Sequence, residues 1–433
     1  MQSNKGYSMA FSKPVYVMLK PVGARCNLAC KYCYYLEKES LVHQAHNDHN
    51  HTFVHEAPSF MDERLLEHFT QEYIEMQSTP QVLFTWHGGE PLLLPISFYE
   101  KALSFQRKYG RGRQIDNVLQ TNGILLTDEW CEFLKRNHFL VGISIDGTQD
   151  IHDHYRKNQH GDNSWEKVMQ GIQLLKKHGV EWNGMATVNA YNVKHPLEFY
   201  HFFKEIGCQY IQFAPIVERK DESGNLQSIL YNHGQVSPTD LSERSGNKEY
   251  LTEESITPED WGNFLCTIFD EWVRHDVGTY FVEIFDSILA NWVGEAPGIC
   301  IFGKECANVA AMERNGDLYS CDHFVFPEYR LGNIQQDSLI SMLYGHKQQA
   351  FASIKSRLLP RQCRECQYLF ACHGECPKNR FAADKYGEPG LNYLCPGYHH
   401  FFEHVAPYME WMKQEYLAGG APANIMKAIE NSL

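Results

Sequence analysis

The chain has 433 residues, of which 43% are hydrophobic and 21% are charged, the composition of an ordinary soluble protein. Its formal net charge of −14 argues against nucleic acid as a partner, because nucleic-acid binding requires a basic surface. The sequence has no apolar run of about 18 residues, so we predict no transmembrane helix and no membrane partner. The length exceeds what one hydrophobic core serves and predicts one large domain with one or two smaller ones.

The N-terminal segment lacks the apolar centre of a secretory signal peptide. The chain nevertheless contains 14 cysteines. Cysteines in a chain without an export signal indicate a reducing compartment, where they ligate metals rather than form disulfides. We therefore expect a cytoplasmic, metal-binding protein, and several bound clusters would indicate an oxygen-poor cell.

Between residues 14 and 217, apolar segments of strand length alternate with amphipathic segments of helix length. The predicted strands are Val15–Lys20, Gln81–His87, Ile115–Gln120, Leu140–Ile145, Glu181–Val188 and Tyr210–Ile216. The predicted helices include Asp62–Gln77, Asp128–Asn137, Trp165–His178 and His195–Ile206. This alternation predicts a parallel sheet that right-handed crossovers curl toward a barrel, with helices outside. In such folds ligands bind at the carboxyl ends of the strands.

Three cysteines follow the first predicted strand within one short loop, at Cys26, Cys30 and Cys33. Thiolates bind zinc or iron–sulfur clusters. A structural zinc site takes four protein ligands, so a zinc knuckle here would need a fourth residue from elsewhere. Three local thiolates instead suit a [4Fe–4S] cluster with one open iron, which can bind a substrate.

Polar and glycine-rich segments follow the next strands in the same way. Gly88-Gly89-Glu90-Pro91 follows the second strand, Gln120–Gly123 ends the third, and Ser144–Gly147 ends the fourth. Paired glycines let a backbone approach a ligand because no Cβ intervenes. These strand ends are therefore the predicted binding region.

Two segments interrupt this pattern. Five histidines lie between His43 and His55 amid polar residues. Such a segment could bind a metal, but we interpret it as a solvated insertion and assign no metal to it. Glu218–Ile256 is rich in acidic and small polar residues and is predicted to be a long surface loop.

The second half of the chain is rich in cysteine. Two amphipathic helices are predicted at Pro258–His275 and Glu283–Val293, and Tyr398–Met412 is predicted to form a closing helix. Eight further cysteines are Cys300, Cys306, Cys321, Cys363, Cys366, Cys372, Cys376 and Cys395. They satisfy two four-thiolate iron–sulfur clusters, and two four-cysteine zinc sites would satisfy the same count.

The dipeptide Asn315-Gly316 predicts a β-hairpin between Ala307–Glu313 and Leu318–Asp322. The hairpin would bring the strand ends near Cys306 and Cys321 side by side. The remaining cysteines are predicted to be buried apolar filler, since they lie in or beside amphipathic segments. They are Cys131, Cys208 and Cys266.

Together these motifs resemble known families. The spacing of Cys26, Cys30 and Cys33, with an aromatic residue before the last, resembles the radical S-adenosylmethionine (SAM) superfamily. The pattern from Cys306 to Cys395 resembles the SPASM domain. The combination resembles the anaerobic sulfatase-maturating enzymes over nearly the whole chain. Its most specific markers are Lys20-Pro21, Cys26–Cys33, Gly88–Pro91, Gln120–Gly123, Ser144–Gly147, Gln212-Phe213, Cys321-Asp322 and Leu331–Ile334.

The resemblance implies an α/β fold, a partial (β/α)6 TIM-like barrel of the radical SAM type followed by a small cysteine-rich SPASM domain with a β-hairpin and helices. The barrel would cover residues 14–217 and a polar linker residues 218–257. The SPASM domain with two auxiliary clusters would cover residues 258–400, and a C-terminal helix and tail residues 401–433.

The resemblance also implies three [4Fe–4S] clusters and S-adenosyl-L-methionine as cofactors. The radical SAM cluster would be bound by Cys26, Cys30 and Cys33. The first auxiliary cluster would be bound by Cys300, Cys306, Cys321 and Cys376, and the second by Cys363, Cys366, Cys372 and Cys395. The residues implied for SAM are Tyr32, Gly88, Gly89, Ser144, Arg156 and Val217.

The activity implied is oxidation of a cysteine, and also of a serine, in a sulfatase to Cα-formylglycine, with SAM cleaved to methionine and 5′-deoxyadenosine. Asp322 matches the family's general base, and its neighbour His323 is a second candidate. We expect the pKa of Asp322 to be raised beside an anionic cluster. The implied partners are an unfolded or nascent sulfatase with a Cys/Ser-x-Pro-x-Arg motif and a reducing electron donor such as ferredoxin or flavodoxin.

Two alternatives remain open from the sequence. The same cofactors would serve a SPASM maturase that acts on a ribosomal peptide, for example by forming a thioether. A zinc-ribbon binding protein without catalytic activity would use the same cysteines.

Overall fold

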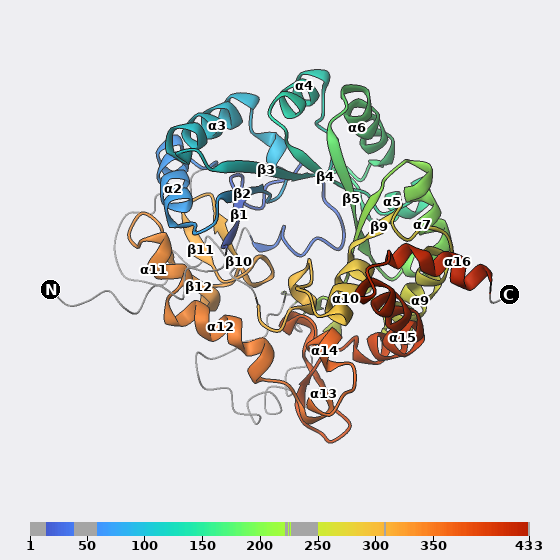
Figure 1. Cartoon of the computed structure of the whole chain (residues 1–433). Coiled ribbons are helices and arrows are strands. Elements are labelled where there is room, and N and C mark those ends of the chain that lie inside the picture. The colour runs from blue at the N-terminus through green and yellow to red at the C-terminus, as the bar shows by residue number, and fades with distance from the viewer. Residues whose placement is uncertain are drawn as a thin grey trace. The chain divides into compact units, whose positions relative to one another are not determined.

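The computed structural model describes residues 14–38, 59–220, 224, 226, 250–306 and 309–431. The predicted histidine-rich insertion and most of the predicted polar linker lie outside the described residues. Contacts divide the chain into two compact units, whose helices and strands are labelled in Figure 1. The first comprises Met1–Ile143, Lys157–Trp182 and Asn308–Ala352, and the second comprises Ser144–Arg156, Asn183–Ala307 and Ser353–Leu433.

The first unit contains a sheet whose strands run in the order β12-β11-β10-β1-β2-β3-β4. The barrel strands are β1 (Tyr16–Lys20), β2 (Gln81–Trp86), β3 (Gln114–Thr121) and β4 (Leu140–Ser144). The later strands are β10 (Val309–Glu313), β11 (Asp317–Tyr319) and β12 (Arg330–Asn333). The pairs β1–β2, β2–β3 and β3–β4 are parallel. The first four predicted strands are thus confirmed to within one residue at each end.

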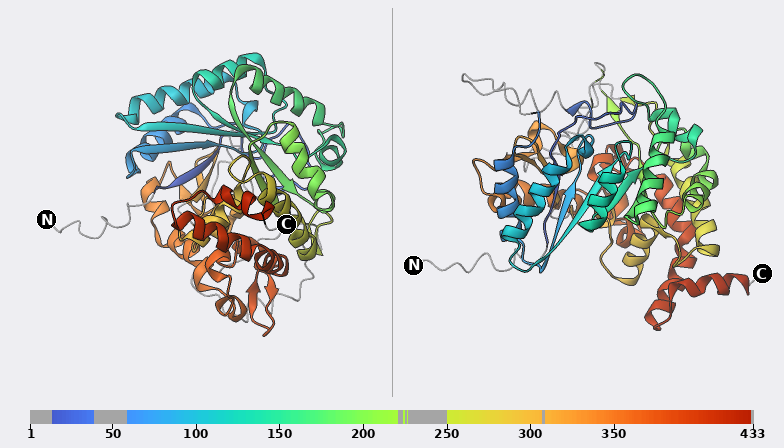
Figure 2. Two further views of the ribbon diagram at one scale, coloured as in Figure 1. Left: turned by 45° about the vertical axis from the view of Figure 1, so that its right-hand side comes forward. Right: turned by 90° about the horizontal axis from the view of Figure 1, so that it is seen from above.

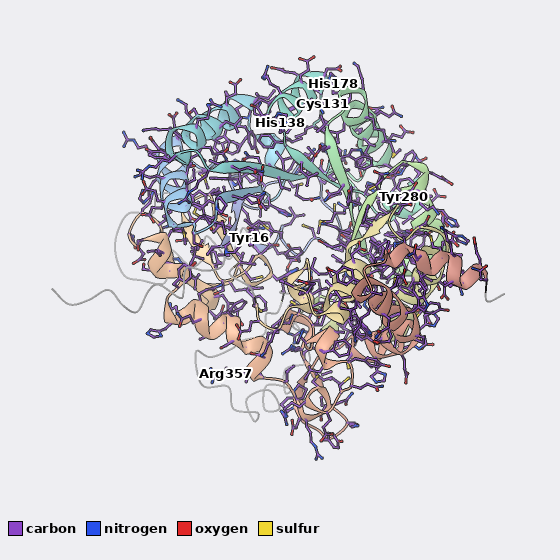
Figure 3. The ribbon with its side chains drawn as sticks, in the orientation of Figure 1. Tyr16, Cys131, His138, His178, Tyr280 and Arg357 are labelled. Atoms are coloured by element: carbon purple, nitrogen blue, oxygen red, sulfur yellow. The ribbon has the colours of Figure 1, made fainter. Side chains whose placement is uncertain are left out.

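Capped amphipathic helices accompany these strands. They are α2 (Glu63–Met76), α3 (Ile96–Gly110), α4 (Asp128–Arg136), α6 (Trp165–His178) and α11 (Leu339–Leu343), and α12 (His346–Arg357) runs from the first unit into the second. The Asp62 carboxylate accepts a hydrogen bond from the Leu65 amide at 2.8 Å and so caps α2. Figure 3 shows Cys131 on α4 and His178 at the end of α6, where the His178 ring bonds the N-terminal residue of α4, Asp128, at 2.7 Å.

The predicted hairpin forms and continues the barrel sheet. β10 and β11 are antiparallel around Gly316, which has a φ of +86° that favours glycine. On its other side β10 pairs in parallel with β1, from Tyr16 opposite Val309 to Lys20 opposite Glu313. This pairing brings the hairpin beside the strand that leads into the first cysteine loop.

The second unit contains the parallel strands β6 (Tyr210–Pro215) and β9 (Phe281–Val282) and all of the parallel strand β5 (Glu181–Val188) except its first two residues. Its longer helices are α5 (Gln149–Tyr155), α7 (Pro196–Glu205), α9 (Pro258–His275), α10 (Glu283–Val293) and α15 (Cys395–Leu417). Its shorter elements are β7 (Arg219–Lys220), β8 (Tyr250–Leu251), α13 (Arg361–Arg364), α14 (Leu369–Cys372), β13 (Ala382–Ala383), β14 (Pro389–Leu391) and α16 (Ile425–Glu430). The predicted strands at 181–188 and 210–216 and the predicted helices in this unit are confirmed.

The core of the second unit is aromatic. α9 and α15 lie side by side (Figure 2), and they approach so closely at Gly262 and Gly397 that a Cβ on Gly397 would lie 2.0 Å from the Pro258 carbonyl oxygen. Phe269 packs against Phe285 and Phe401 with ring centroids 5.3 and 6.0 Å apart. Helices α9, α10 and α15 therefore share one apolar core.

The compact units do not follow the segments predicted from the sequence, because residues 308–352 of the cysteine-rich half belong to the first unit. The prediction of buried filler is confirmed, since Cys131, Cys208 and Cys266 are at most 8% exposed. None of the described helices combines the length and the apolar character that a membrane span needs.

Gly171 of α6 provides a test of the packing in the first unit. A Cβ at this position would lie 2.4 Å from the backbone oxygen of Gly123, at the end of β3. Alanine is favoured by about 1 kcal/mol in a helix, but overpacking against a backbone costs about 1–3 kcal/mol. We expect Gly171→Ala to lower the free energy of unfolding by about 1 kcal/mol net, measured by chemical denaturation. The exposed neighbour Gln170→Ala is the control, and equal stability of both variants would contradict this packing.

Candidate active site and cluster-binding cysteines

The first cysteine loop is held in place by hydrogen bonds. The Ala29 amide donates to the Lys157 carbonyl at 2.8 Å, and the Gln159 side chain donates to the Cys26 carbonyl at 2.8 Å. The Cys26 sulfur accepts from the Leu28 amide at 3.3 Å and from the Asn122 amide group at 3.7 Å. Burial raises the pKa of Cys26 to about 12. N–H donors directed at a partly buried sulfur suit a thiolate ligand and fit an iron–sulfur cluster.

The Gly88–Pro91 segment packs directly on this loop. The Gly89 amide donates to the Gly23 carbonyl at 2.8 Å, and the Glu90 amide donates to the Arg25 carbonyl at 2.9 Å. A Cβ on Gly89 would lie 2.0 Å from the Arg25 oxygen, so only glycine fits there. Gly88 has a φ of +125°, which again favours glycine.

Glu90 connects this segment to the end of β3. Its carboxylate accepts hydrogen bonds from the Thr121 hydroxyl at 2.7 Å, the Leu92 amide at 3.0 Å and the Asn122 amide at 2.8 Å. Burial raises the pKa of Glu90 to about 7, against the effect of these three donors. Glu90 thus hydrogen-bonds the Gly-Gly-Glu-Pro motif to the Gln-Thr-Asn-Gly motif, and together the two motifs support the cysteine loop.

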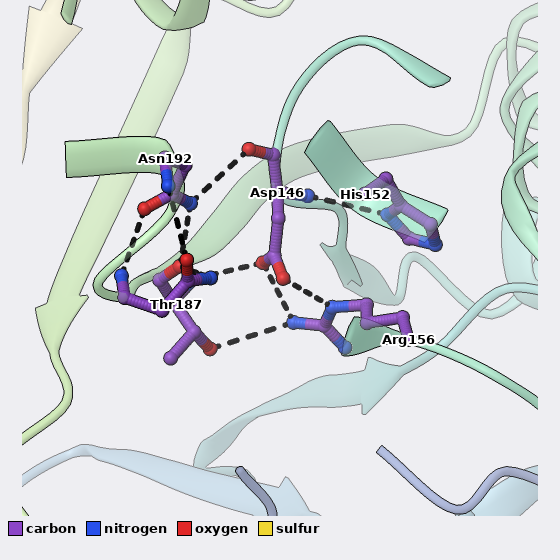
Figure 4. Close-up of polar contacts among 6 residues, drawn as sticks. Asp146, His152, Arg156, Thr187 and Asn192 are labelled. Atoms are coloured by element: carbon purple, nitrogen blue, oxygen red, sulfur yellow. Dashed lines mark hydrogen bonds and ion pairs between the residues drawn. The ribbon is translucent and has the colours of Figure 1, made fainter. Parts of the chain in front are cut away.

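In the second unit, Arg156 forms a bidentate ion pair with Asp146 (Figure 4). The guanidinium Nε and Nη2 donate to the two carboxylate oxygens at 2.9 and 3.0 Å. Asp146 also accepts from the Thr187 amide at 2.9 Å, and its own amide donates to the His152 ring at 3.3 Å. Asp146 follows β4 and Thr187 lies near the end of β5, whereas His152 lies in α5 and Arg156 directly follows that helix. This network fixes the orientation of the guanidinium.

Asp322 lies in a buried cluster of charges in the first unit. Its carboxylate forms an ion pair with Lys20, at the end of β1, and accepts a hydrogen bond from the Tyr34 hydroxyl. Burial alone would raise the pKa of Asp322, but the charges of Lys20, His87 and His323 outweigh burial and lower it well below its usual range. Our prediction of a raised pKa was therefore wrong, because the sequence does not show that Lys20 reaches this carboxylate.

Lys38 fixes the backbone that carries Asp322. Its ammonium group donates to the Asp322 and His323 carbonyls, both at 3.1 Å, and lies 4.8 Å from the ring centroid of Tyr34. Lys38 is only 2% exposed. Since Lys38 follows the first cysteine loop by five positions, this contact joins the loop to the turn after β11.

A buried lysine of the second unit lies beside one of the predicted ligand residues. Burial lowers the pKa of Lys355, while the charges of Cys306, Cys376 and Cys300 act in the opposite direction. The Lys355 ammonium group donates to the Cys300 carbonyl at 2.7 Å. Burial raises the pKa of Cys306 to about 11. These three are members of the predicted first auxiliary set, whose fourth member, Cys321, belongs to the first unit.

The predicted second auxiliary set lies entirely in the second unit. Burial raises the pKa of Cys395 to about 12, and the charges of Cys363 and Cys366 raise it further. Burial also raises the pKa of Cys372, with further contributions from Cys395 and Cys363. These effects are compatible with the four-cysteine set that the resemblance implies. Within the described part of the chain, no three Cys, His, Asp or Glu side chains are gathered as tightly as around a single metal ion.

Comparisons with known proteins agree with these motifs. The family model of the radical SAM superfamily matches residues 21–203, and that of the SPASM iron–sulfur cluster-binding domain matches residues 300–367. The chain is 58% identical to a serine-type anaerobic sulfatase-maturating enzyme of Bacteroides thetaiotaomicron, covering 97% of this chain and 96% of that protein. The chain belongs to the anaerobic sulfatase-maturating enzymes.

Other members of this family are more distant. A cysteine-type enzyme of Clostridium perfringens is 30% identical, over 91% of this chain and 97% of that protein. A solved sulfatase-maturating enzyme with bound AdoMet and a Cp18Cys peptide is 28% identical and superposes with a TM-score of 0.76, covering 93% of this chain and all of that one.

Membership of the anaerobic sulfatase-maturating enzymes decides between the alternatives that the sequence left open. The chain is a radical SAM oxidoreductase with an iron–sulfur SPASM domain, and the zinc-ribbon alternative was wrong. Radical SAM chemistry requires a [4Fe–4S] cluster and SAM, and the SPASM domain binds additional iron–sulfur clusters.

Several residues that form the candidate site of this sulfatase-maturating enzyme were not predicted from the sequence. Lys20 was noted only as a motif residue, and Tyr34, Lys38 and Lys355 were not singled out. Asp146 was noted only as part of the Ser144–Gly147 motif. Lys20 had a detectable signal, because a lysine that ends a buried strand must have a partner. Lys355 sits in a helix of mixed polarity and gives no such signal.

His152 provides a pH test of the network around Arg156. Burial, together with the positive charge of Arg156, lowers the pKa of His152 to about 3, from 6.5. Between pH 6.5 and 3 the unfolded chain binds a proton that the folded chain does not, so stability rises with pH across this window. Going from pH 6.5 to 5 should cost about 1.6 kcal/mol, because the slope rises from half of its full value of about 1.4 kcal/mol per pH unit as the unfolded imidazole becomes protonated.

We therefore expect His152→Gln to reduce the loss of unfolding free energy between pH 6.5 and 5, measured by chemical denaturation at each pH. The exposed His160→Gln is the matched control and should retain the loss. Parallel pH dependences for wild type and His152→Gln would show that this imidazole is not held neutral.

Proposed function

We propose that this chain oxidises a serine or cysteine side chain of a sulfatase polypeptide to Cα-formylglycine. The sequence similarity covers 96% of a relative named serine-type and 97% of another named cysteine-type. The observation that carries the proposal for this chain is the position of Asp322. This buried carboxylate follows a cysteine of the iron–sulfur domain and is hydrogen-bonded to a residue of the radical SAM loop.

The proposed cofactors are three [4Fe–4S] clusters and SAM. The proposed ligands are those of the sequence prediction, with Cys26, Cys30 and Cys33 leaving one iron open for SAM. Gly88 and Gly89 would offer backbone carbonyls to the SAM amino group. Ser144 and the oriented guanidinium of Arg156 would contact SAM, with Tyr32 and the main chain at Val217 as further contacts.

When bound, the clusters and SAM supply the one-electron chemistry that no side chain can perform, namely hydrogen-atom abstraction from Cβ and acceptance of the remaining electron. The protein supplies the proton acceptor. We assign this role to Asp322, whose ionised carboxylate would take the hydroxyl or thiol proton of the target residue. Lys20 and Tyr34 keep this carboxylate ionised and oriented. Its lowered pKa reduces its strength as a base, so the assignment depends on its position rather than on its pKa.

The proposed partner is an unfolded or nascent sulfatase that presents a Cys-x-Pro-x-Arg or Ser-x-Pro-x-Arg motif. The target residue must reach a buried carboxylate, which an extended segment can do and a folded domain cannot. We also propose a cytoplasmic location and a small reducing protein, such as ferredoxin or flavodoxin, as electron donor.

The proposed function is tested by anaerobic reconstitution followed by a peptide assay on the same sample. We expect about twelve iron atoms per chain for three clusters, and cleavage of SAM under a strong reductant. A serine peptide with the motif should lose the mass of two hydrogen atoms and gain an aldehyde that reacts with a hydrazide. Iron loading and SAM cleavage without any change in either a serine or a cysteine peptide would contradict the proposed substrate.

The role of Asp322 is tested separately by Asp322→Ala. General-base catalysis contributes about 10²–10⁴-fold, so formylglycine formation should fall by at least about 100-fold. SAM affinity and iron content should stay unchanged, because Asp322 is assigned no ligand role. The exposed Asp337→Ala in the same unit is the control. Unchanged turnover in Asp322→Ala would exclude the proposed base.

A further inference from the structure

Asn122 is a residue of the candidate site to which the proposed function gives no role. It directly follows β3 and is buried, with 6% of its surface exposed. Its backbone amide donates to the Glu90 carboxylate at 2.8 Å. Its side-chain oxygen accepts a hydrogen bond from the Ile124 amide at 3.1 Å. A backbone N–H can only donate, so the contact with Ile124 identifies the oxygen end of the Asn122 side chain.

The NH2 group at the other end of this side chain is directed at the first cysteine loop. It donates to the Asn27 side-chain oxygen at 2.8 Å and to the Cys26 sulfur at 3.7 Å. The same sulfur accepts from the Leu28 backbone amide at 3.3 Å. The sulfur of one predicted ligand of the radical SAM cluster thus receives two N–H groups, one from its own loop and one from the end of β3.

An N–H group directed at a ligand sulfur acts on the charge of a bound cluster. The potentials of iron–sulfur clusters depend on hydrogen bonds to their sulfurs. Reduction adds a negative charge to the cluster, and the positive end of an N–H dipole stabilises the reduced form more than the oxidised form. The Leu28 donor is a backbone group that any residue would supply. The Asn122 donor, in contrast, depends on the identity of one side chain.

We propose that Asn122, by donating to Cys26, raises the reduction potential of the radical SAM cluster and so favours entry of the electron that cleaves SAM. This inference rests on the ligand set of the proposed function, in which Cys26 binds that cluster. The electron comes from the reducing donor protein, or from dithionite in the test. Asn122 acts through Cys26 and is a positioning residue, with no assigned contact to SAM or substrate.

Three single variants separate this role from a role in holding the loop. Asn122→Asp keeps the size of the side chain and the oxygen that accepts from Ile124, but it removes the N–H donor. Asn122→Ala removes the donor without adding a charge. Asn27→Ala is the matched control, because it removes the contact between Asn122 and Asn27 and leaves the contact with Cys26.

The full chain and each variant are reconstituted anaerobically and titrated potentiometrically with dithionite, and the reduced clusters are followed by electron paramagnetic resonance. The variant Cys26→Ala/Cys30→Ala/Cys33→Ala should lack the signal of the radical SAM cluster, which identifies that signal in the other samples. It should also contain about four iron atoms fewer. An unchanged iron count in this triple variant would contradict the ligand set of the proposed function, whatever the role of Asn122.

At a fixed potential, Asn122→Asp and Asn122→Ala should each lower the reduced-to-oxidised ratio of the radical SAM cluster at least about threefold, or about 28 mV at about 59 mV per tenfold for a one-electron couple. The signals of the auxiliary clusters should not move, and Asn27→Ala should keep the wild-type ratio. An unchanged ratio in both Asn122 variants would overturn the proposal. An equal decrease in Asn27→Ala would also overturn it, because the effect would then come from holding the loop.

Iron counts decide the case in which an Asn122 variant does not retain the radical SAM cluster. If only Asn122→Ala loses about four iron atoms, the potential of Asn122→Asp is the test. Loss from both Asn122 variants, but not from Asn27→Ala, supports a requirement for the N–H group at Cys26. Loss from all three variants shows that Asn122 acts only by holding the loop, and overturns the proposal.

Discussion

The parallel pairing of β1 with β10 is the constraint on which the candidate site depends. It joins the strand that leads into the first cysteine loop to a hairpin nearly three hundred residues later in the chain. Because Lys20 stands opposite Glu313 in this register, the ends of both strands meet at one place. Cys33 and Tyr34 then pack against a buried cluster that includes Ala311 and Tyr319 of the hairpin. The iron–sulfur hairpin is therefore part of the barrel sheet of the first unit.

The buried charged groups where β1 meets the hairpin stabilise one another. Lys20 is fully buried, pairs with Asp322 and lies 3.4 Å from the ring centroid of Tyr35. The Tyr35 hydroxyl in turn donates to Glu313. Removing one member of a buried ion pair commonly costs about 3–5 kcal/mol, because the other charge is left without a partner. The position and ionisation of Asp322 are thus consequences of folding, which prepares the carboxylate before any substrate arrives.

Local patterns were sufficient to predict the helices, the strands and the hairpin. Alternating apolar segments gave the six barrel strands, and Asn315-Gly316 gave the hairpin, because both are signals within a few neighbouring residues. The pairing of the hairpin with β1 was not predictable, since strand partners far apart in sequence leave no periodic signal. The same limitation explains the wrong direction of the Asp322 pKa, which depends on Lys20 and His87 from two other strands. The partner of Arg156 was missed for the same reason, although Asp146 lies in a motif that the sequence analysis recorded.

Buried lysines occur in both units. Lys20 and Lys38 hold the proposed base in the first unit, and Lys355 donates to the Cys300 carbonyl in the second. The central claim remains that the chain oxidises Cβ of its target residue. The most direct test is a motif peptide with deuterium at Cβ of serine, incubated anaerobically with the reconstituted protein and SAM. The account predicts that deuterium appears in the 5′-deoxyadenosine that is released together with an aldehyde peptide. Deoxyadenosine without deuterium, beside an oxidised peptide, would contradict it.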